Sequence, residues 1–250
     1  MTPAERIFKS FDRIYVINLA DRADRRRDMA AELASIGTSF DDPRVRLFPA
    51  IRPDDAGPFR TIGARGAFLS QLGILTEARD LGCHRILMFE DDLDFVPGFT
   101  AAIGPALDML DILGGDIFYG GYIFPDGRGH VDATATPLAL AEHDNPIRLA
   151  HFMGFGRAAI EGLVPYLEAM LNRAAGDPAG GPMDVDGAYN WFREAHPEIS
   201  AWLAQPQLGV QRPSRTDISA PGPIDRLPLG TPVRNAVRGA LRIWKRRRPA

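Results

Sequence analysis

The sequence predicts an α/β fold, in which a mostly parallel β-sheet is flanked by helices. Short runs of branched and aromatic residues, such as those at 13–19 and 85–89, have the composition of buried strands. Stretches with helical periodicity separate these runs, and strands that alternate with helices are typical of a parallel sheet. Hydrophobic residues make up 45% of the chain and charged residues 24%, which is ordinary for a folded, water-soluble protein.

The first half of the chain gives the clearest elements. The run RIYVINL at 13–19 is mostly apolar, as expected of a buried strand. After it, Met29, Leu33 and Ile36 fall on one helical face, and Gly37 is a natural end for that helix. The expected elements, in order, are a strand at 13–19, a helix at 21–36, a strand at 45–48, a loop at 49–63, a helix at 68–81, a strand at 85–89, a helix at 97–113 and a strand at 116–119.

The second half has a less regular pattern. We expect a strand at 149–155, a helix at 157–171, a loop rich in Gly, Pro and Asp, a helix at 188–195 and an irregular polar stretch at 206–215. A chain of 250 residues is long enough for one large domain plus a tail. We therefore expect one domain at 1–228, followed by a basic tail at 229–250.

The sharpest chemical signal is a cluster of acids directly after the strand at 85–89. Glu90, Asp91 and Asp92 are consecutive, and Asp94 follows closely. Ligands of open α/β sheets bind outside the carboxyl ends of strands, where this cluster falls. Crowded carboxylates repel one another, and oxygen ligands without nearby His or Cys suit Mg²⁺ or Mn²⁺, which would bridge a diphosphate. The alternative is a solvated acidic turn, and the spacing alone leaves both interpretations open.

Two further groups have both a functional and a structural interpretation. Asn18, Arg22, Arg25 and Arg26 lie at the exit of the first strand and the start of a helix, where phosphate would bind. The alternative is a solvated basic face. In GPMDVDGAYNWF, Asp184 or Asp186 would act as a general base on an acceptor hydroxyl, or would simply cap the helix that follows.

Several classes of protein lack their usual signals in this chain. There is no GxSxG elbow, no GxxxxGK[ST] loop and no HExxH helix. Cys83 is the one cysteine, so no internal disulfide forms, and a cytoplasmic location fits. No run of about 20 apolar residues or signal-peptide pattern is present, so we expect neither a spanning helix nor secretion.

With these residues in view, the chain resembles glycosyltransferase family 25, which includes bacterial lipooligosaccharide transferases and the collagen galactosyltransferases. The matching pieces, in order, are IYVINL with DRADRR, then GARGAFLSQLGILTEARDLG leading into ILMFEDDLDF, then GDIFYGG. A weaker similarity continues through HFMGFGRAAIEGLVP, PMDVDGAYNWF and QPQLGVQRPSRTDIS. The resemblance therefore spans about residues 13–219.

The resemblance implies a glycosyltransferase-A fold, a nucleotide-sugar donor such as UDP-galactose, and Mn²⁺ or Mg²⁺ held by the acidic segment, with Asp92 as the favoured ligand. The implied reaction is inverting transfer of galactose or another hexose to a hydroxyl of a glycan or lipid-linked glycan, in lipopolysaccharide or surface polysaccharide biosynthesis. The expected site residues are Asp92 and Glu90 for the metal, Asn18, Arg22, Arg25, Ser70, Glu90 and Asp91 for the donor, and Asp186 or Asp184 as the base.

The chain departs from the family at one motif. The family commonly has Gly-Glu-x-Gly-Cys-x-x-Ser-His where this chain has GARGAFLSQ at 63–71, so Ala64 and Gln71 replace Glu and His. These departures motivate a second hypothesis, a non-catalytic protein of the same fold that binds a nucleotide sugar or a glycan. A third hypothesis is a metal-dependent phosphohydrolase that uses the same acids.

The charge distribution suggests a separate partner for the tail. Residues 231–250 carry seven Arg or Lys and no acid, and without these seven the net charge of −3 becomes −10. An acidic body argues against nucleic-acid binding. The tail fits a basic amphipathic helix that lies on anionic lipid at the cytoplasmic face of the membrane. A disordered or partner-docking tail is the alternative, and the sequence leaves both open.

Overall fold

The structure is a computed structural model that describes residues 1–125 and 136–212. Its centre is one seven-stranded sheet, and two further short strands pair with each other beside it. The strands are β1 (Arg13–Asn18), β2 (Val45–Pro49), β3 (Arg85–Glu90), β4 (Leu93–Phe95), β5 (Ile117–Tyr119), β6 (Leu138–Leu140), β7 (Phe152–Gly156), β8 (Ala201–Ala204) and β9 (Gly209–Gln211).

The strand order in the large sheet is β2-β1-β3-β7-β5-β8-β6. Five of these strands run in one direction, while β7 and β6 run against them. The prediction of a mostly parallel sheet is therefore confirmed. The antiparallel strand β7 lies at the middle of the sheet, which the strand's composition did not indicate, because a strand buried on both faces has the same apolar pattern in either direction.

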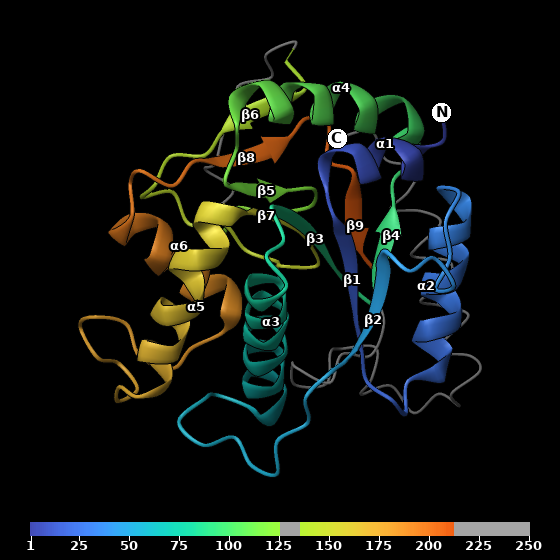
Figure 1. The fold of residues 1–250 in the computed structure, drawn as a ribbon. Helices are drawn as coiled ribbons and strands as arrows, with labels where there is room; N and C mark the ends of the chain where they lie inside the picture. Colours follow the sequence, from blue (N-terminus) through green and yellow to red (C-terminus); the bar gives the residue numbers. More distant parts are fainter. Residues whose placement is uncertain (126–135, 213–250) are drawn as a thin grey trace.

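Helices cover both faces of the sheet, and Figure 1 shows them around its strands. One buried apolar cluster lies between one face of the sheet and the helices α3, α5 and α6. A second cluster lies between the other face and the helices α1, α2 and α4. The helices are α1 (Pro3–Ser10), α2 (Ala23–Ser35), α3 (Ile62–Asp80), α4 (Phe99–Leu113), α5 (Arg157–Leu171) and α6 (Val185–Ala195).

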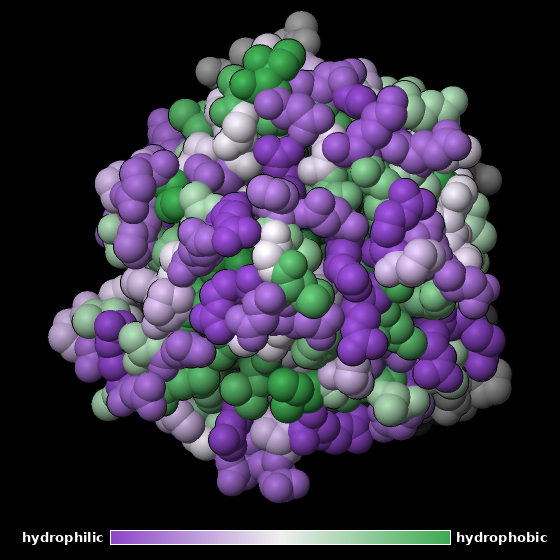
Figure 2. Space-filling model, in the orientation of Figure 1, coloured by the Kyte–Doolittle hydropathy of each residue, from purple (hydrophilic) through white to green (hydrophobic). Residues whose placement is uncertain are grey.

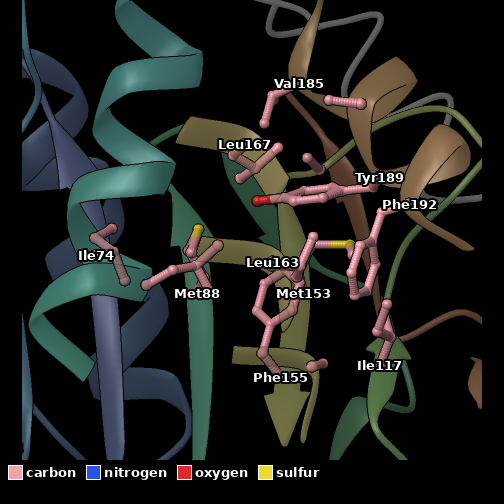
Figure 3. Packing of buried hydrophobic residues seen from close by; sticks show 14 of the residues in the cluster. Ile74, Met88, Ile117, Met153, Phe155, Leu163, Leu167, Val185, Tyr189 and Phe192 are labelled. Carbon is pink, nitrogen blue, oxygen red and sulfur yellow. The ribbon is translucent and has the colours of Figure 1, made fainter. Parts of the chain in front are cut away.

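The central strands are apolar on both faces because both faces are covered. In β3, Met88 belongs to the cluster under α3, α5 and α6, while its neighbour Phe89 belongs to the other cluster. Figure 3 shows part of the first cluster, where Met88 lies among apolar side chains of the helices, including Leu163 and Leu167 of α5. Full burial of such a side chain contributes about 1.5–3 kcal/mol.

The order of the strands reverses at β1. From β1 the chain passes through α2 to β2 on one side, and then returns past β1, through α3, to β3 on the other side. Because α2 and α3 cover opposite faces, a crevice opens outside the carboxyl ends of β1 and β3. Asn18 and Glu90 end these two strands.

Most expected elements are confirmed, and the main differences are in where helices begin. α3 begins at Ile62, ahead of the apolar positions at 68–81 that mark the expected helix, and the Thr61 hydroxyl caps it by accepting the N–H of Ala64 at 3.0 Å. α6 begins at Val185 instead of 188, which places Asp184 at its N-cap. The stretch at 206–215 was expected to be irregular, which is wrong at β9, because β9 pairs with β4. The elements α1, β4, β6 and β8 were not expected.

The surface is mixed, and Figure 2 shows hydrophilic and hydrophobic side chains interspersed over one face. Such a mixture is ordinary for a folded protein. Of the helices within 1–125 and 136–212, none combines the length and apolar character needed to cross a bilayer. The basic tail at 229–250, with its expected helix, lies outside the described residues, so both stay predictions.

Candidate functional site

A cavity of about 370 Å³ lies at the carboxyl ends of the parallel strands β1, β2 and β3. One wall is the acidic turn that we define as Glu90, Asp91 and Asp92, which follows β3 directly. The loop after β2 and the first turns of α3 supply the opposite wall. The cavity-lining residues are Ile17, Leu19, Arg25, Ala50, Ile51, Arg52, Pro53, Ile62, Gly63, Gly66, Ala67, Ser70, Glu90, Asp91 and Asp92.

Asp91 is bound on both of its carboxylate oxygens. Arg25 Nη1 donates to Oδ1 at 2.8 Å, and Asn18 Nδ2 donates to Oδ2 at 2.7 Å. Arg25 comes from the first turn of α2 and lines the cavity, whereas Asn18 is buried behind the turn and does not. The structure therefore places Asn18 as a support for Asp91. Arg22 binds Asp24 and is also outside the lining of the cavity.

Asp92 is the acid with unused ligand capacity. Its Oδ2 accepts from Gln211 Nε2 at 3.3 Å and lies 3.5 Å from Arg25 Nη1. Its Oδ1 is buried and has no hydrogen-bond partner among the described residues. The residue is 5% exposed and lines the cavity, so this oxygen is shielded from bulk solvent. A buried carboxylate oxygen of this kind is costly unless a proton or a cation meets it.

Glu90 is held by a chain of two hydrogen bonds that runs from α6 through α3. Gln71 Nε2 donates to Glu90 Oε1 at 3.1 Å, and the Tyr189 hydroxyl donates to Gln71 Oε1 at 2.7 Å. Figure 3 shows Tyr189 extending from α6 across the sheet, with its hydroxyl directed toward the α3 side. Gln71 and Tyr189 are fully buried. The sequence marked Gln71 as a departure from the family motif and did not single out Tyr189, because a contact across 118 residues leaves no local pattern.

The electrostatics of the acidic turn favour an added positive charge. Burial raises the pKa of Glu90 well above its usual value, and the nearby charges of Asp92 and Asp91 raise it further. Burial likewise raises the pKa of Asp92, against the opposing effect of Arg25. A proton or a metal cation relieves the same repulsion, because each removes negative charge from a site with little water.

The wall opposite the acids depends on a close backbone approach. Ser70 Oγ accepts the N–H of Ile51 at 2.8 Å and donates to the carbonyl of Gly66 at 2.6 Å, which holds the loop after β2 against α3. A Cβ at Gly66 would lie 2.6 Å from the carbonyl oxygen of Ile51. Ser70 therefore lines the cavity with its hydroxyl engaged in shaping the wall, and its contact with a donor stays a prediction.

Arg212, just after β9, was missed by sequence reasoning. Its guanidinium binds Asp94 Oδ1 at 2.7 Å, Asp28 Oδ2 at 3.0 Å and the carbonyls of Asp91 and Leu93 at 3.4 and 3.3 Å. Its backbone N–H donates to the carbonyl of Asp92 at 2.6 Å. It thus fixes the backbone of the acidic turn from behind. The residue lies in a stretch that its polar composition marked only as irregular.

The two candidate bases in α6 are not equivalent, and neither lines the cavity. Asp184 pairs with Arg60 at 2.9 Å and stands at the N-cap, although its side chain makes no capping bond. Asp186 accepts the N–H of Leu149 at 3.2 Å, and its charge raises the pKa of Glu90. Of the two, Asp186 is therefore the one that faces the acidic turn electrostatically.

The residues present fit a hard cation whose coordination is completed by phosphate oxygens of a bound substrate. Within residues 1–125 and 136–212, no group of three or more His, Cys, Asp or Glu side chains is arranged to hold a metal by itself. Mg²⁺-type sites commonly use one or two carboxylates together with the phosphates of a substrate. Asp92, with its unpartnered Oδ1, and Glu90 would supply such a pair. The metal stays a prediction.

The comparisons with known proteins confirm the resemblance to family 25. No family model matches the chain. A mouse protein named "Inactive glycosyltransferase 25 family member 3" is 29% identical over 235 residues, which are 82% of this chain and 38% of that protein. The human protein of the same name is 31% identical, over 47% of this chain and 23% of its own length. A "Glycosyltransferase 25 family member" of Anopheles gambiae is 31% identical, over 45% of this chain and 22% of its own length.

The chain spans less than two fifths of the length of these curated relatives. Among solved structures, a mannose-1-phosphate geranyltransferase from Thermus thermophilus matches with a TM-score of 0.38. That match has 16% sequence identity and covers 80% of this chain and 61% of the other. It is a distant likeness.

Proposed function

Because the chain is homologous to glycosyltransferase 25 family members, we propose that it is a glycosyltransferase whose cavity binds a nucleotide-sugar donor. The observation that carries the proposal is the unpartnered Asp92 Oδ1, buried in the lining of a cavity that also contains Arg25. A buried acid and a guanidinium side by side suit a cation and a diphosphate together. The finer proposal is a UDP-hexose donor, with galactose the first sugar to test.

In the proposed reaction, a hydroxyl oxygen of the acceptor forms a bond to the anomeric carbon of the sugar. The bond between that carbon and the diphosphate oxygen breaks, its electron pair stays on the diphosphate, and the hydroxyl proton passes to Asp186. Mn²⁺ or Mg²⁺, held by Asp92 with Glu90, would offset the charge that develops on the diphosphate. Arg25 would bind a phosphate oxygen, and Ser70 would keep the opposite wall in place.

We prefer Asp186 to Asp184 as the base for a structural reason. The carboxylate of Asp184 is paired with the guanidinium of Arg60 at 2.9 Å, so it would have to give up this ion pair to accept a proton. The charge of Asp186 acts on Glu90 of the acidic turn and on the buried Tyr189. The acceptor would then lie between the cavity and α6. A glycan or lipid-linked glycan of lipopolysaccharide or surface polysaccharide biosynthesis is the proposed acceptor.

A second candidate function is binding of a nucleotide sugar without turnover. The human and mouse relatives carry the word "Inactive" in their names, and Ala64 and Gln71 depart from the family motif. This candidate predicts donor binding with no transfer to any acceptor. The phosphohydrolase hypothesis predicts instead that phosphate is released from a nucleotide or sugar phosphate when no acceptor is present.

The first test is calorimetric binding of a panel of UDP-sugars, with and without Mn²⁺, to the wild type and to Asp92→Ala. We expect binding that requires Mn²⁺ and is lost in the variant, because the buried oxygen that would meet the cation is gone. Asp80→Ala is the matched control, since Asp80 is an exposed acid at the end of α3. Failure of the wild type to bind any nucleotide sugar would reject the proposal.

A further inference from the structure

Arg25 already occupies the place of a counter-ion in the acidic turn. Its Nη1 lies 2.8 Å from Asp91 Oδ1 and 3.5 Å from Asp92 Oδ2, and its side chain is 11% exposed. The two carboxylates are as well buried as the arginine, so water screens these interactions weakly. One guanidinium therefore neutralises part of the charge of Asp91 and Asp92 from within the cavity.

This pairing leaves the acidic turn incompletely neutralised. Asp92 Oδ1 has no hydrogen-bond partner in the described part of the chain, and Glu90 contributes a third acid to the same wall. Arg212 approaches the turn from behind, where it binds Asp94, Asp28 and backbone carbonyls. The charge that remains on the cavity side would attract a divalent cation, and that cation would repel the guanidinium that now shares Asp91 and Asp92.

We propose that Arg25 is an exchangeable counter-ion: it pairs with Asp91 and Asp92 when no divalent cation is bound, and it turns to the donor's diphosphate when one is. The proposal deepens the proposed function and rests on it. Arg25 sits in the first turn of α2 on a long side chain that lines the cavity, so its guanidinium needs only a change of rotamer to reach a ligand there. A guanidinium fork also matches phosphate oxygens in two-point contacts.

The exchange links the two binding events. A cation that displaces Arg25 makes a phosphate-binding group available, so the cation raises the affinity for the donor. By thermodynamic reciprocity, the donor raises the affinity for the cation by the same factor. Without the cation, the guanidinium stays paired with Asp91 and Asp92. It is then unavailable to a phosphate oxygen, and the negative charge that remains on the acidic turn repels the diphosphate. Arg25 is thus a positioning residue in the metal-free protein and a donor ligand in the loaded one.

The test measures Mn²⁺ alone and UDP separately, by calorimetry on metal-free protein at pH 8. In Arg25→Gln we expect Mn²⁺ to bind on the order of tenfold more tightly, because a competing positive charge is removed. In saturating Mn²⁺ we expect UDP to bind on the order of tenfold more weakly, because the phosphate contact is lost. An increase in the affinity for Mn²⁺ together with a decrease in the affinity for UDP is the result that the exchange predicts. A residue that merely holds the turn in shape would lower both affinities.

Two further variants complete the test. Arg27→Gln removes the same charge from an exposed position on α2 and should leave both affinities near those of the wild type. Arg25→Lys keeps the charge but loses the fork, so it should weaken UDP binding while leaving Mn²⁺ binding close to wild type. Thermal unfolding checks that each variant folds.

Three other results would overturn the proposed exchange. Parallel losses of both affinities in Arg25→Gln, or no change in either, overturn the exchange, and so does the absence of Mn²⁺ binding in both wild type and variant. If the opposite shifts appear but no sugar is transferred to any acceptor, the exchange stands and only the proposed transfer is rejected.

Discussion

Gln71 stands where family 25 commonly has His, and the structure shows what an amide does there. Its amide nitrogen donates to Glu90, and its amide oxygen accepts from Tyr189. A neutral imidazole also offers one donor and one acceptor, so glutamine preserves that pattern without a group that titrates near pH 7. The substitution is therefore compatible with a working site, which weakens the motive for the non-catalytic alternative.

A buried histidine gives the clearest pH-dependent prediction at this scale. Burial lowers the pKa of His151 to about 4, and the residue is 1% exposed. In the unfolded chain a histidine titrates near pH 6.5, so below that pH the unfolded state binds the extra proton first. His151 thus costs no stability above pH about 6.5, and the free energy of unfolding falls by on the order of 3 kcal/mol as the pH drops to about 4.

Urea unfolding at a series of pH values measures this effect. His151→Gln should flatten the dependence of the unfolding free energy on pH between about 6.5 and 4, because the titrating group is gone. His84→Gln makes the same replacement at an exposed position and should leave the dependence as it is. Equal slopes in the wild type and in His151→Gln would refute the prediction.

The sequence pattern indicated the cavity-lining residues at strand and helix ends, but not the residues that contact them from far along the chain. Glu90, Asp91, Asp92 and Arg25 sit at strand and helix ends, where a local pattern predicts a ligand site, and all line the cavity. The roles of Arg212 and Tyr189 depend on contacts across more than 100 residues. Such contacts are set by tertiary packing, and one sequence does not show them.

The α3 helix and the loop after β2 give a prediction at the scale of elements. Gly66→Ala would place a Cβ 2.6 Å from the carbonyl of Ile51, and backbone does not yield as cheaply as a side-chain tip. We expect the loop to shift, a loss of stability of about 1–3 kcal/mol, and on the order of tenfold weaker UDP binding. Thermal unfolding and calorimetry in Mn²⁺ measure the two effects.

Gly104 supplies the control, because it lies inside α4 and a Cβ there meets nothing within 4 Å. Gly104→Ala should stabilise the protein by about 0.5–1 kcal/mol, since alanine is the better helix former, and should leave UDP binding unchanged. If Gly66→Ala and Gly104→Ala had the same stability and the same affinity for UDP, the close backbone approach at Gly66 would not be needed for donor binding.

Element boundaries were harder to predict than the elements themselves. The strands β1 and β3 were found because a strand buried on both faces is apolar throughout. The start of α6 was placed three residues late, at 188, because its first turn carries an acid and a glycine, which are poor helix formers. That error matters for function, since the true start puts Asp186 within the helix.

At the scale of the whole molecule, charge is divided between an acidic body and a basic segment at 231–250. We expect a variant that lacks residues 231–250 to lose binding to vesicles containing phosphatidylglycerol, because each basic residue contributes about 1 kcal/mol near an anionic surface. UDP binding should be unchanged, since the described residues that line the cavity all come from 17–92. Co-sedimentation and calorimetry measure the two properties.

Neutral phosphatidylcholine vesicles are the control for the tail, and the full chain should bind them weakly. Equal sedimentation of the full chain and the shortened variant with phosphatidylglycerol vesicles would remove membrane attachment from the proposal. A tail that instead docks a protein partner would behave in this second way.

The contacts of Arg212 have a consequence for how the protein is made. Its guanidinium supports a turn that was synthesised about 120 residues earlier, and it reaches Asp28 at the other end of the chain. A nascent chain therefore carries the acidic turn without its rear support until residue 212 has left the ribosome. During that time Asn18, Arg25 and Gln71 can hold the crowded carboxylates, but Gln211 and Arg212 cannot, so the ability to bind a nucleotide should arise late in translation.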